Sequence, residues 1–183
     1  PATYGRLIAL MEIIRDTLPG VVIAGDSTQP VYAAAVGFAA AAPRRWFCSA
    51  TGFGTLGYGL PAAIGARIGR PDAPVVCLTG DGGFQFSLPE LASAREAGTP
   101  VIVVLWNNFS HGEIKSYMLS RGIAPVGVDL FTPDFQTLAR AFDCHALRLG
   151  SPAELPAALR AAAAQDKPTV IEIDEKAYLS APA

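Results

Sequence analysis

Apolar and polar positions follow two different spacings along this chain. Residues 75–79 and 101–106 are short apolar runs, rich in β-branched side chains and bounded by turn formers, which is typical of buried strands. Between them, residues 88–97 carry apolar side chains at helical spacing in a helix-forming composition. A strand, a helix and a second strand in this order form a βαβ unit, so we predict that the two strands are parallel.

The same alternation continues over the whole chain and predicts its fold class, an α/β fold with a three-layer parallel sheet and helices on both faces. The other expected elements are helices at residues 4–17, 30–40, 57–68, 134–142 and 152–164, a helical turn from about Gly112, and strands at 21–24, 45–49, 144–149 and 169–173. Glycines and prolines break the pattern over residues 119–133, and a loop of this length is either a lid or a plain surface connection.

Composition narrows the function classes. With 183 residues, 51% of them apolar, and a net charge of −2, the chain suits one globular domain over residues 1–183. Its basic residues are scattered, so we expect no nucleic-acid partner, and the longest small-apolar stretch, 31–42, is too short to span a membrane. Cys48, Cys77 and Cys144 lie in or beside apolar runs without metal-ligand spacing, so we predict buried thiols in a soluble, cytoplasmic protein.

Polar groups follow the two central strands where each strand ends. Asp81 stands in the glycine-rich segment 80–83, made of Gly80, Asp81, Gly82 and Gly83, and Asn108 closes the second run. Ligands of parallel sheets bind beyond the carboxyl ends of the strands. We expect the glycines to form a tight turn that aims N–H groups at an anion.

Metal binding follows from the oxygens at these two ends. Asp81 offers a carboxylate, Asn108 a side-chain amide oxygen and Ser110 a backbone carbonyl, and Mg²⁺ prefers such oxygens and completes its shell with water and diphosphate. The sequence therefore predicts a metal-bridged diphosphate clamp with Asp81, Asn108 and Ser110 as metal ligands.

Gly-Asp-Gly, a gap of 24 residues (83–106) and Asn-Asn together resemble the signature of a known family. It is the diphosphate-binding C-terminal domain of thiamine diphosphate (ThDP) enzymes, the acetolactate synthase and 2-oxoacid decarboxylase group. The resemblance continues in GFGTLGYGLPAAIGA, residues 52–66. It implies that Gly54 and Thr55 meet the cofactor, Gly54 through its backbone at the 4'-amino group, and that Leu56 wedges the cofactor into its bent form. The alternative for Leu56 is an ordinary core leucine.

Two further segments are assigned through the same resemblance. Ser27, Thr28 and Gln29, in GDSTQPVY at residues 25–32, are placed to donate to diphosphate oxygens. They would equally suit a helix N-cap beside Pro30.

Beyond the Asn-Asn pair, His111 and Gly112 join the expected cofactor-binding set, although relatives often carry Tyr or Gln at the place of His111. Glu113 and Ile114 open the next helix in the stretch that faces substrate, and Glu113 joins Leu56 as a candidate catalytic residue. Alternatively, Glu113 is a solvated acid favoured by the helix dipole. His145 lies in a strand-like run and is interpreted as structural.

A dinucleotide-binding interpretation competes with the ThDP one. Gly52, Gly54 and Gly57 form G-x-G-x-x-G, which would suggest an NAD-dependent oxidoreductase. Asp72 is the acidic residue about twenty positions on, but it precedes a strand, whereas ribose recognition needs it after one. A non-catalytic domain that keeps the fold alone is a third possibility.

The resemblance implies decarboxylation of a 2-oxo acid, or transfer of its acyl carbanion to a second carbonyl, with ThDP and Mg²⁺. The motifs look more like acetolactate synthases and guanidino-oxo-acid decarboxylases than like pyruvate decarboxylase. In this family the activating glutamate belongs to a separate pyrimidine-binding domain, normally on a partner subunit, and nothing here resembles that domain. The chain starts at Pro1 and its first helical run begins almost at once, so we expect a domain boundary inside a longer chain or a trimmed form. The resemblance implies that this is the C-terminal part of a three-domain, homo-oligomeric enzyme and that the isolated chain is inactive.

Overall fold

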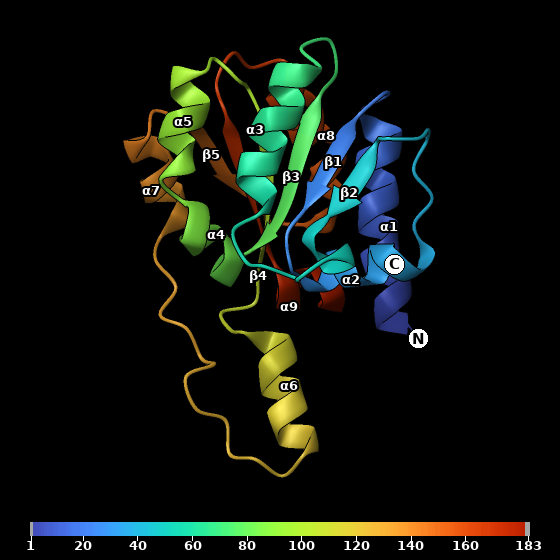
Figure 1. The fold of residues 1–183 in the computed structure, drawn as a ribbon, viewed down its shortest axis with the longest axis vertical. Helices are drawn as coiled ribbons and strands as arrows, with labels where there is room; N and C mark the ends of the chain where they lie inside the picture. The colour runs from blue at the N-terminus through green and yellow to red at the C-terminus, as the bar shows by residue number, and fades with distance from the viewer. Residues whose placement is uncertain (1, 182–183) are drawn as a thin grey trace.

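The computed structural model describes residues 2–181, and a six-stranded parallel sheet forms its centre (Figure 1). The order across the sheet is β2-β1-β3-β4-β6-β5, and every neighbouring pair is parallel. The strands are β1 Val22–Gly25, β2 Trp46–Cys48, β3 Val75–Gly80, β4 Ile102–Asn107, β5 His145–Arg148 and β6 Thr169–Asp174. The predicted α/β class is confirmed.

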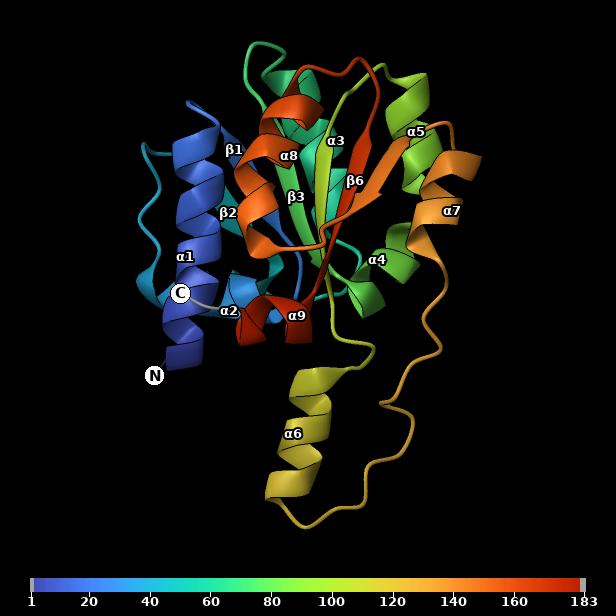
Figure 2. The same cartoon turned by 180° about the vertical axis from the view of Figure 1, so that it is seen from behind.

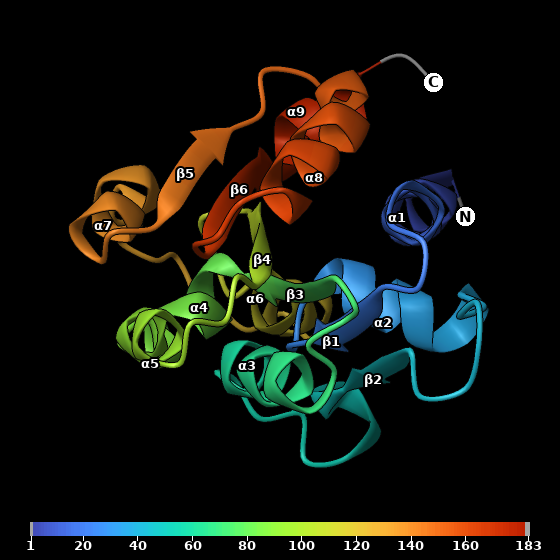
Figure 3. The same ribbon diagram turned by 90° about the horizontal axis from the view of Figure 1, so that it is seen from above.

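Helices cover both faces of the sheet, as the view from above shows (Figure 3). One face carries α1 Ala2–Thr17, α2 Gln29–Gly37, α8 Leu155–Ala163 and α9 Glu175–Ser180, and the other carries α3 Gly59–Gly69, α4 Asp81–Ser87, α5 Glu90–Glu96 and α7 Phe135–Ala141, with short 3₁₀ turns at η1 Ser49–Thr51 and η2 Pro152–Glu154. Alternate residues of the central strands feed the two cores: Leu78 packs on the α1 side and Cys77 on the α3 side. Because these strands are buried on both sides, their sequences are continuous apolar runs.

Helix α6, Gly112–Ser120, projects beyond the sheet, and residues 121–134 lead back to α7 (Figures 1 and 2). The sequence predicted a single turn here, but α6 has nine residues. None of them is buried in the described part of the chain. An antiparallel bridge between Ser110 and Asp129 ties the returning segment to the start of α6.

The predicted tight glycine turn at residues 80–83 is wrong. Asp81, Gly82 and Gly83 form the first turn of α4, without left-handed glycines. Close packing favours glycine here instead, because a Cβ on Gly82 would lie 2.8 Å from Cε1 of His111, whose ring would have to move. The helix predicted at 88–97 is confirmed as α5, Glu90–Glu96, whereas α4 before it was not predicted. Helix α9 was also missed, because it is only six residues long.

Other expectations are settled by burial. All three cysteines are free and buried, as predicted. His145, interpreted as a structural strand residue, does lie in β5, but its side chain is exposed. Within residues 2–181, no helix combines the length and the apolar character needed to cross a bilayer.

Candidate diphosphate and metal site

The site lies at a switch point of the sheet. After β1 the chain turns to β2 on one side, and after β3 it continues to β4 on the other side, so the segments that leave β1 and β3 diverge. Such crevices hold ligands in open parallel sheets. A cavity of about 220 Å³ lies there, lined by Ser27, Thr28, Gln29, Tyr32, Gly54, Leu56, Gly80, Asp81, Gly82, Gly83, Asn108, Ser110, His111, Gly112, Glu113 and Ile114. The structure thus brings together every site residue predicted from the sequence except Thr55, which is exposed and outside the lining.

Asp81 is the first residue of α4 and is 2% exposed. Burial raises the pKa of its carboxyl, and the backbone N–H groups of Gly82, Asn108 and Ser110 act in the opposite direction. Its Oδ2 is buried without a hydrogen-bond partner among the described residues. A buried carboxylate oxygen of this kind costs free energy unless a proton or a cation satisfies it.

The turn after β4 presents Asn108 beside that carboxylate. The Oδ1 of Asn108 accepts a hydrogen bond from the Ser110 N–H at 3.2 Å, which fixes the side chain. The Ser110 hydroxyl donates to the Val128 carbonyl at 2.9 Å and anchors the turn to the returning segment. Asn107 differs from Asn108: it is 1% exposed and lies outside the cavity lining.

These groups fit a magnesium–diphosphate complex. Asp81 supplies one unpartnered carboxylate oxygen, and Asn108 supplies a neutral oxygen that keeps a free lone pair. In residues 2–181, no three His, Cys, Asp or Glu side chains gather into a metal cluster. A set with one carboxylate suits Mg²⁺, which completes its octahedron with water and phosphate oxygens.

The loop before α3 lies on the other side of the cavity. Gly54 has φ +65°, a conformation that glycine adopts without strain. The Ser27 hydroxyl donates to the Gly54 carbonyl at 2.8 Å and so holds this loop, and its donation to a diphosphate stays a prediction. Leu56 is partly exposed, lines the cavity and belongs to neither core cluster, which argues against the ordinary-core alternative.

Thr28 and Gln29 are at the start of α2. Thr28 takes the N-cap position expected from the alternative interpretation, but its side chain makes no cap hydrogen bond. Both residues line the cavity, so their polar groups are available to a ligand.

Sequence reasoning missed Asp26, which is 0% exposed. Its Oδ1 accepts hydrogen bonds from the N–H groups of Ser27 at 2.7 Å and Gly57 at 3.3 Å, and Oδ2 accepts from Gly59 at 2.9 Å. Burial raises the pKa of Asp26, and these three N–H groups lower it. The carboxylate ties the β1 exit to the 54–59 loop. The signal was present, because an aspartate directly follows the glycine that ends the strand, both here and after β3.

Tyr32 was also missed, although it lies one helical turn beyond Thr28 on α2. It lines the cavity, and burial raises its pKa, with a further contribution from the nearby charge of Glu113. Glu113 is exposed in the first turn of α6, and it lines the cavity beside Ile114. Glu113 therefore satisfies both interpretations: it lies where the helix dipole favours an acid, and it also lines the cavity.

The acidic residue of the dinucleotide interpretation lies elsewhere. Asp72 is exposed, pairs with Arg70 at 3.2 Å and precedes β3, at the opposite end of the strand from the cavity. Asp72 therefore cannot contact a ligand that is bound near Gly54.

Comparison with known proteins agrees with this geometry. A family model described as "Thiamine pyrophosphate enzyme, C-terminal TPP binding domain" matches residues 21–173. The chain belongs to this family. The cofactor class is therefore thiamine diphosphate, as the sequence motifs predicted, and not the NAD of the alternative interpretation.

Several relatives and solved structures are similar to the domain. "Probable 2-ketoarginine decarboxylase AruI" of Pseudomonas aeruginosa is 44% identical over 94% of this chain and 32% of its own length. A probable acetolactate synthase large subunit of Methanococcus aeolicus is 37% identical over 74% of this chain and 23% of its own length. The structure of a Rhodococcus jostii RHA1 thiamine diphosphate-dependent 4-hydroxybenzoylformate decarboxylase has a TM-score of 0.80 and 29% identity, covering 92% of this chain and 32% of that one. The chain thus spans about a third or less of the length of these proteins.

Proposed function

We propose that this domain binds the diphosphate of ThDP through Mg²⁺, as part of an enzyme that decarboxylates a 2-oxo acid with a cationic tail. The observation that carries the cofactor proposal is the unpartnered, buried Oδ2 of Asp81 beside Asn108. When bound, ThDP supplies the electron sink for loss of CO₂. The domain contributes binding and orientation, with Asp81, Asn108 and the Ser110 carbonyl as metal ligands and Leu56 as the wedge under the cofactor.

The substrate class rests on Glu113 and on one relative. A carboxylate at the cavity would pair with a guanidinium or ammonium group. The Pseudomonas relative, named for 2-ketoarginine, is 44% identical to the chain. Transfer of the acyl group to a second carbonyl is the alternative, and the similarity to acetolactate synthase large subunits supports it.

A second domain is needed to complete the cavity. Its volume of about 220 Å³ is below the roughly 300–1,000 Å³ of typical ligand sites. Large apolar side chains stand exposed on α6 and on the loop before α3, among them Ile114, Tyr117 and Phe53. We infer that a pyrimidine-binding domain, on the same chain or on the partner subunit of a homo-oligomer, covers this face.

Calorimetric titration tests the metal-bridged clamp. Wild-type protein should bind ThDP with Mg²⁺ and lose this binding with EDTA, and Asp81→Ala should abolish the metal-dependent part because the diphosphate charge then lacks its bridge. Asp72→Ala is the matched control, an aspartate at the far end of β3 that should leave the affinity unchanged. Equal ThDP affinity in Asp81→Ala and wild type would refute the clamp. No ThDP binding by any form would favour the non-catalytic alternative.

A further inference from the structure

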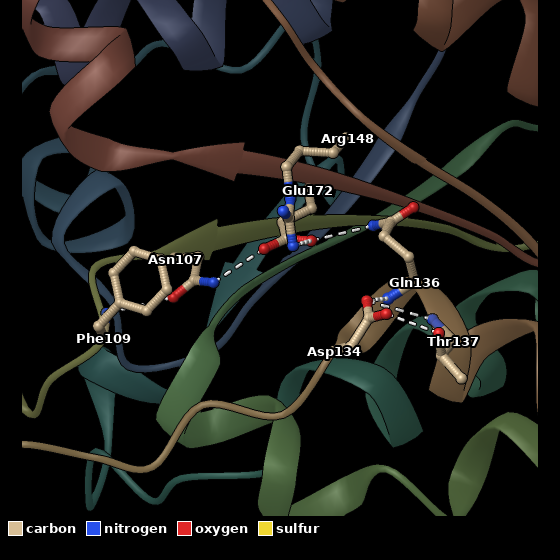
Figure 4. A network of polar contacts seen from close by, with 7 residues as sticks. All are labelled: Asn107, Phe109, Asp134, Gln136, Thr137, Arg148 and Glu172. Carbon is tan, nitrogen blue, oxygen red and sulfur yellow. Dashed lines mark hydrogen bonds and ion pairs between the residues drawn. The ribbon is translucent and has the colours of Figure 1, made fainter.

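Glu172 is an acidic residue inside the core and has no role in the function proposed so far. It lies on β6, is 1% exposed and does not line the cavity. Its Oε1 accepts a hydrogen bond from Nδ2 of Asn107 at 2.8 Å (Figure 4). Its Oε2 accepts from Nε2 of Gln136 at 3.0 Å and pairs with Nη2 of Arg148 at 3.0 Å. Three elements, β4, α7 and β5, therefore converge on one carboxylate.

Asn107 connects this carboxylate to the turn after β4. Its Nδ2 is taken by Glu172, which leaves Oδ1 pointing the other way, where it accepts the Phe109 N–H at 3.1 Å. Phe109 has φ +59°, a left-handed conformation that is unfavourable for a bulky side chain. Asn108 and Ser110, the proposed metal ligands, stand on either side of Phe109.

We propose that Glu172 is a positioning residue: through Asn107 it holds the Phe109 turn in the conformation that directs Asn108 and Ser110 toward Asp81. The amide of Asn107 must keep its NH₂ on the carboxylate, so its oxygen is fixed on Phe109. The Phe109 conformation is thereby stabilised by a network that reaches across four secondary-structure elements. The link to Mg²⁺ rests on the proposed function, whereas the effect on the turn does not.

Hydrogen–deuterium exchange of the full-length protein measures the turn directly, without cofactor. In Glu172→Ala, the amides of Phe109 and Ser110 should exchange about tenfold or more faster than in wild type, because the Asn107 oxygen is no longer fixed. Asn107→Ala should have the same effect while leaving Gln136 and Arg148 on Glu172, so it serves if Glu172→Ala does not fold.

Arg148→Ala is the matched control, since it removes a partner from the other oxygen of the same carboxylate. It should leave exchange at Phe109 and Ser110 within about twofold of wild type, whatever it does to global stability. Exchange in Glu172→Ala and Asn107→Ala no faster than in Arg148→Ala would overturn the proposal.

Affinity for Mg²⁺ in the presence of ThDP gives a second measurement. Loss of a residue that orients metal ligands typically costs about 10–100-fold in metal affinity, and we expect this for Glu172→Ala but not for Arg148→Ala. In a Phe109→Gly background the cost should shrink, because glycine adopts positive φ without help. Equal costs in both backgrounds would exclude a route through Phe109. If wild type binds no ThDP with Mg²⁺, the proposed function fails, and the exchange measurement still decides the role of Glu172.

Discussion

Two buried aspartates at the ends of adjacent strands differ in the hydrogen-bond partners of their carboxylate oxygens. Asp26 follows β1 and accepts three backbone N–H groups, whereas Asp81 follows β3 and keeps one oxygen without a partner among the described residues. Burial raises the pKa of both carboxyl groups. This difference in hydrogen bonding indicates that Asp26 holds the fold, and it leaves an oxygen of Asp81 available for the proposed cation.

Replacing Asp26 tests the first half of this contrast. Asp26→Ala should lower the free energy of unfolding by about 3 kcal/mol, because buried N–H groups lose their acceptor. The folded pKa is raised, so this group stabilises most below the ordinary value of 3.8, and the contribution falls as pH rises through the folded pKa. Urea unfolding between pH 4.5 and 8 should therefore show the wild-type advantage shrinking with pH. An advantage that grows with pH would contradict the assignment.

Glu113 carries the prediction about substrate. In the full-length enzyme, Glu113→Gln should lower kcat/KM for 2-oxo acids with a guanidinium or ammonium tail by about tenfold, since a charge-assisted hydrogen bond is lost. Pyruvate, which has no such tail, is the internal control and should change much less. A uniform change across substrates would return Glu113 to a helix-dipole role.

Helix α4 depends on glycine to approach its neighbours. A Cβ on Gly83 would lie 2.9 Å from Oδ1 of Asp26, which three hydrogen bonds hold in place. Gly83→Ala should therefore destabilise the domain by about 1–3 kcal/mol. Gly65→Ala in α3 has no heavy atom within 4 Å of the new Cβ and should stabilise by about 0.5–1 kcal/mol. Thermal unfolding of both variants measures the pair, and equal effects would mean that packing at Gly83 is not limiting.

Elements with a buried face could be predicted, and those without one could not. The central strands β3 and β4 were found because burial on both sides makes them continuous apolar runs. Helix α6 was reduced to one turn because none of its residues is buried, so it shows no helical period. The glycines of α4 were taken for a turn because the residues that leave no room for their side chains, His111 and Asp26, are distant in the sequence.

The site could be predicted as far as neighbouring strand ends allow. Asp81 and Asn108 were paired because parallel strands end at one edge of the sheet. Glu172 could not be found this way, since its contacts with Asn107, Gln136 and Arg148 depend on the order of β4, β6 and β5. Strand order across a sheet is a tertiary property that periodicity does not contain.

Helix α6, whose Glu113 and Ile114 line the cavity, projects beyond the rest of the domain (Figure 2). Phe53 on the opposite loop is fully exposed, and Ile114 and Tyr117 on α6 are more than half exposed. Ile114 lines the cavity, and exposed apolar side chains at such a place are typical of a surface that another domain covers. A ligand held from one side keeps contacts to its diphosphate and loses orientation at its other end.

The last prediction follows from this half-open site: purified residues 1–183 should bind ThDP weakly and should not turn over 2-oxo acids. Gly54 and Leu56 line the cavity where the aminopyrimidine would lie, but the glutamate that activates it belongs, by family resemblance, to a separate domain. Both orientation and acid–base chemistry are then incomplete. Steady-state assays with pyruvate and a basic 2-oxo acid, run beside the full-length enzyme, measure the difference. Turnover by the isolated chain at an ordinary enzymatic rate would require a base within it, and His111 and Glu113 would be the first residues to replace.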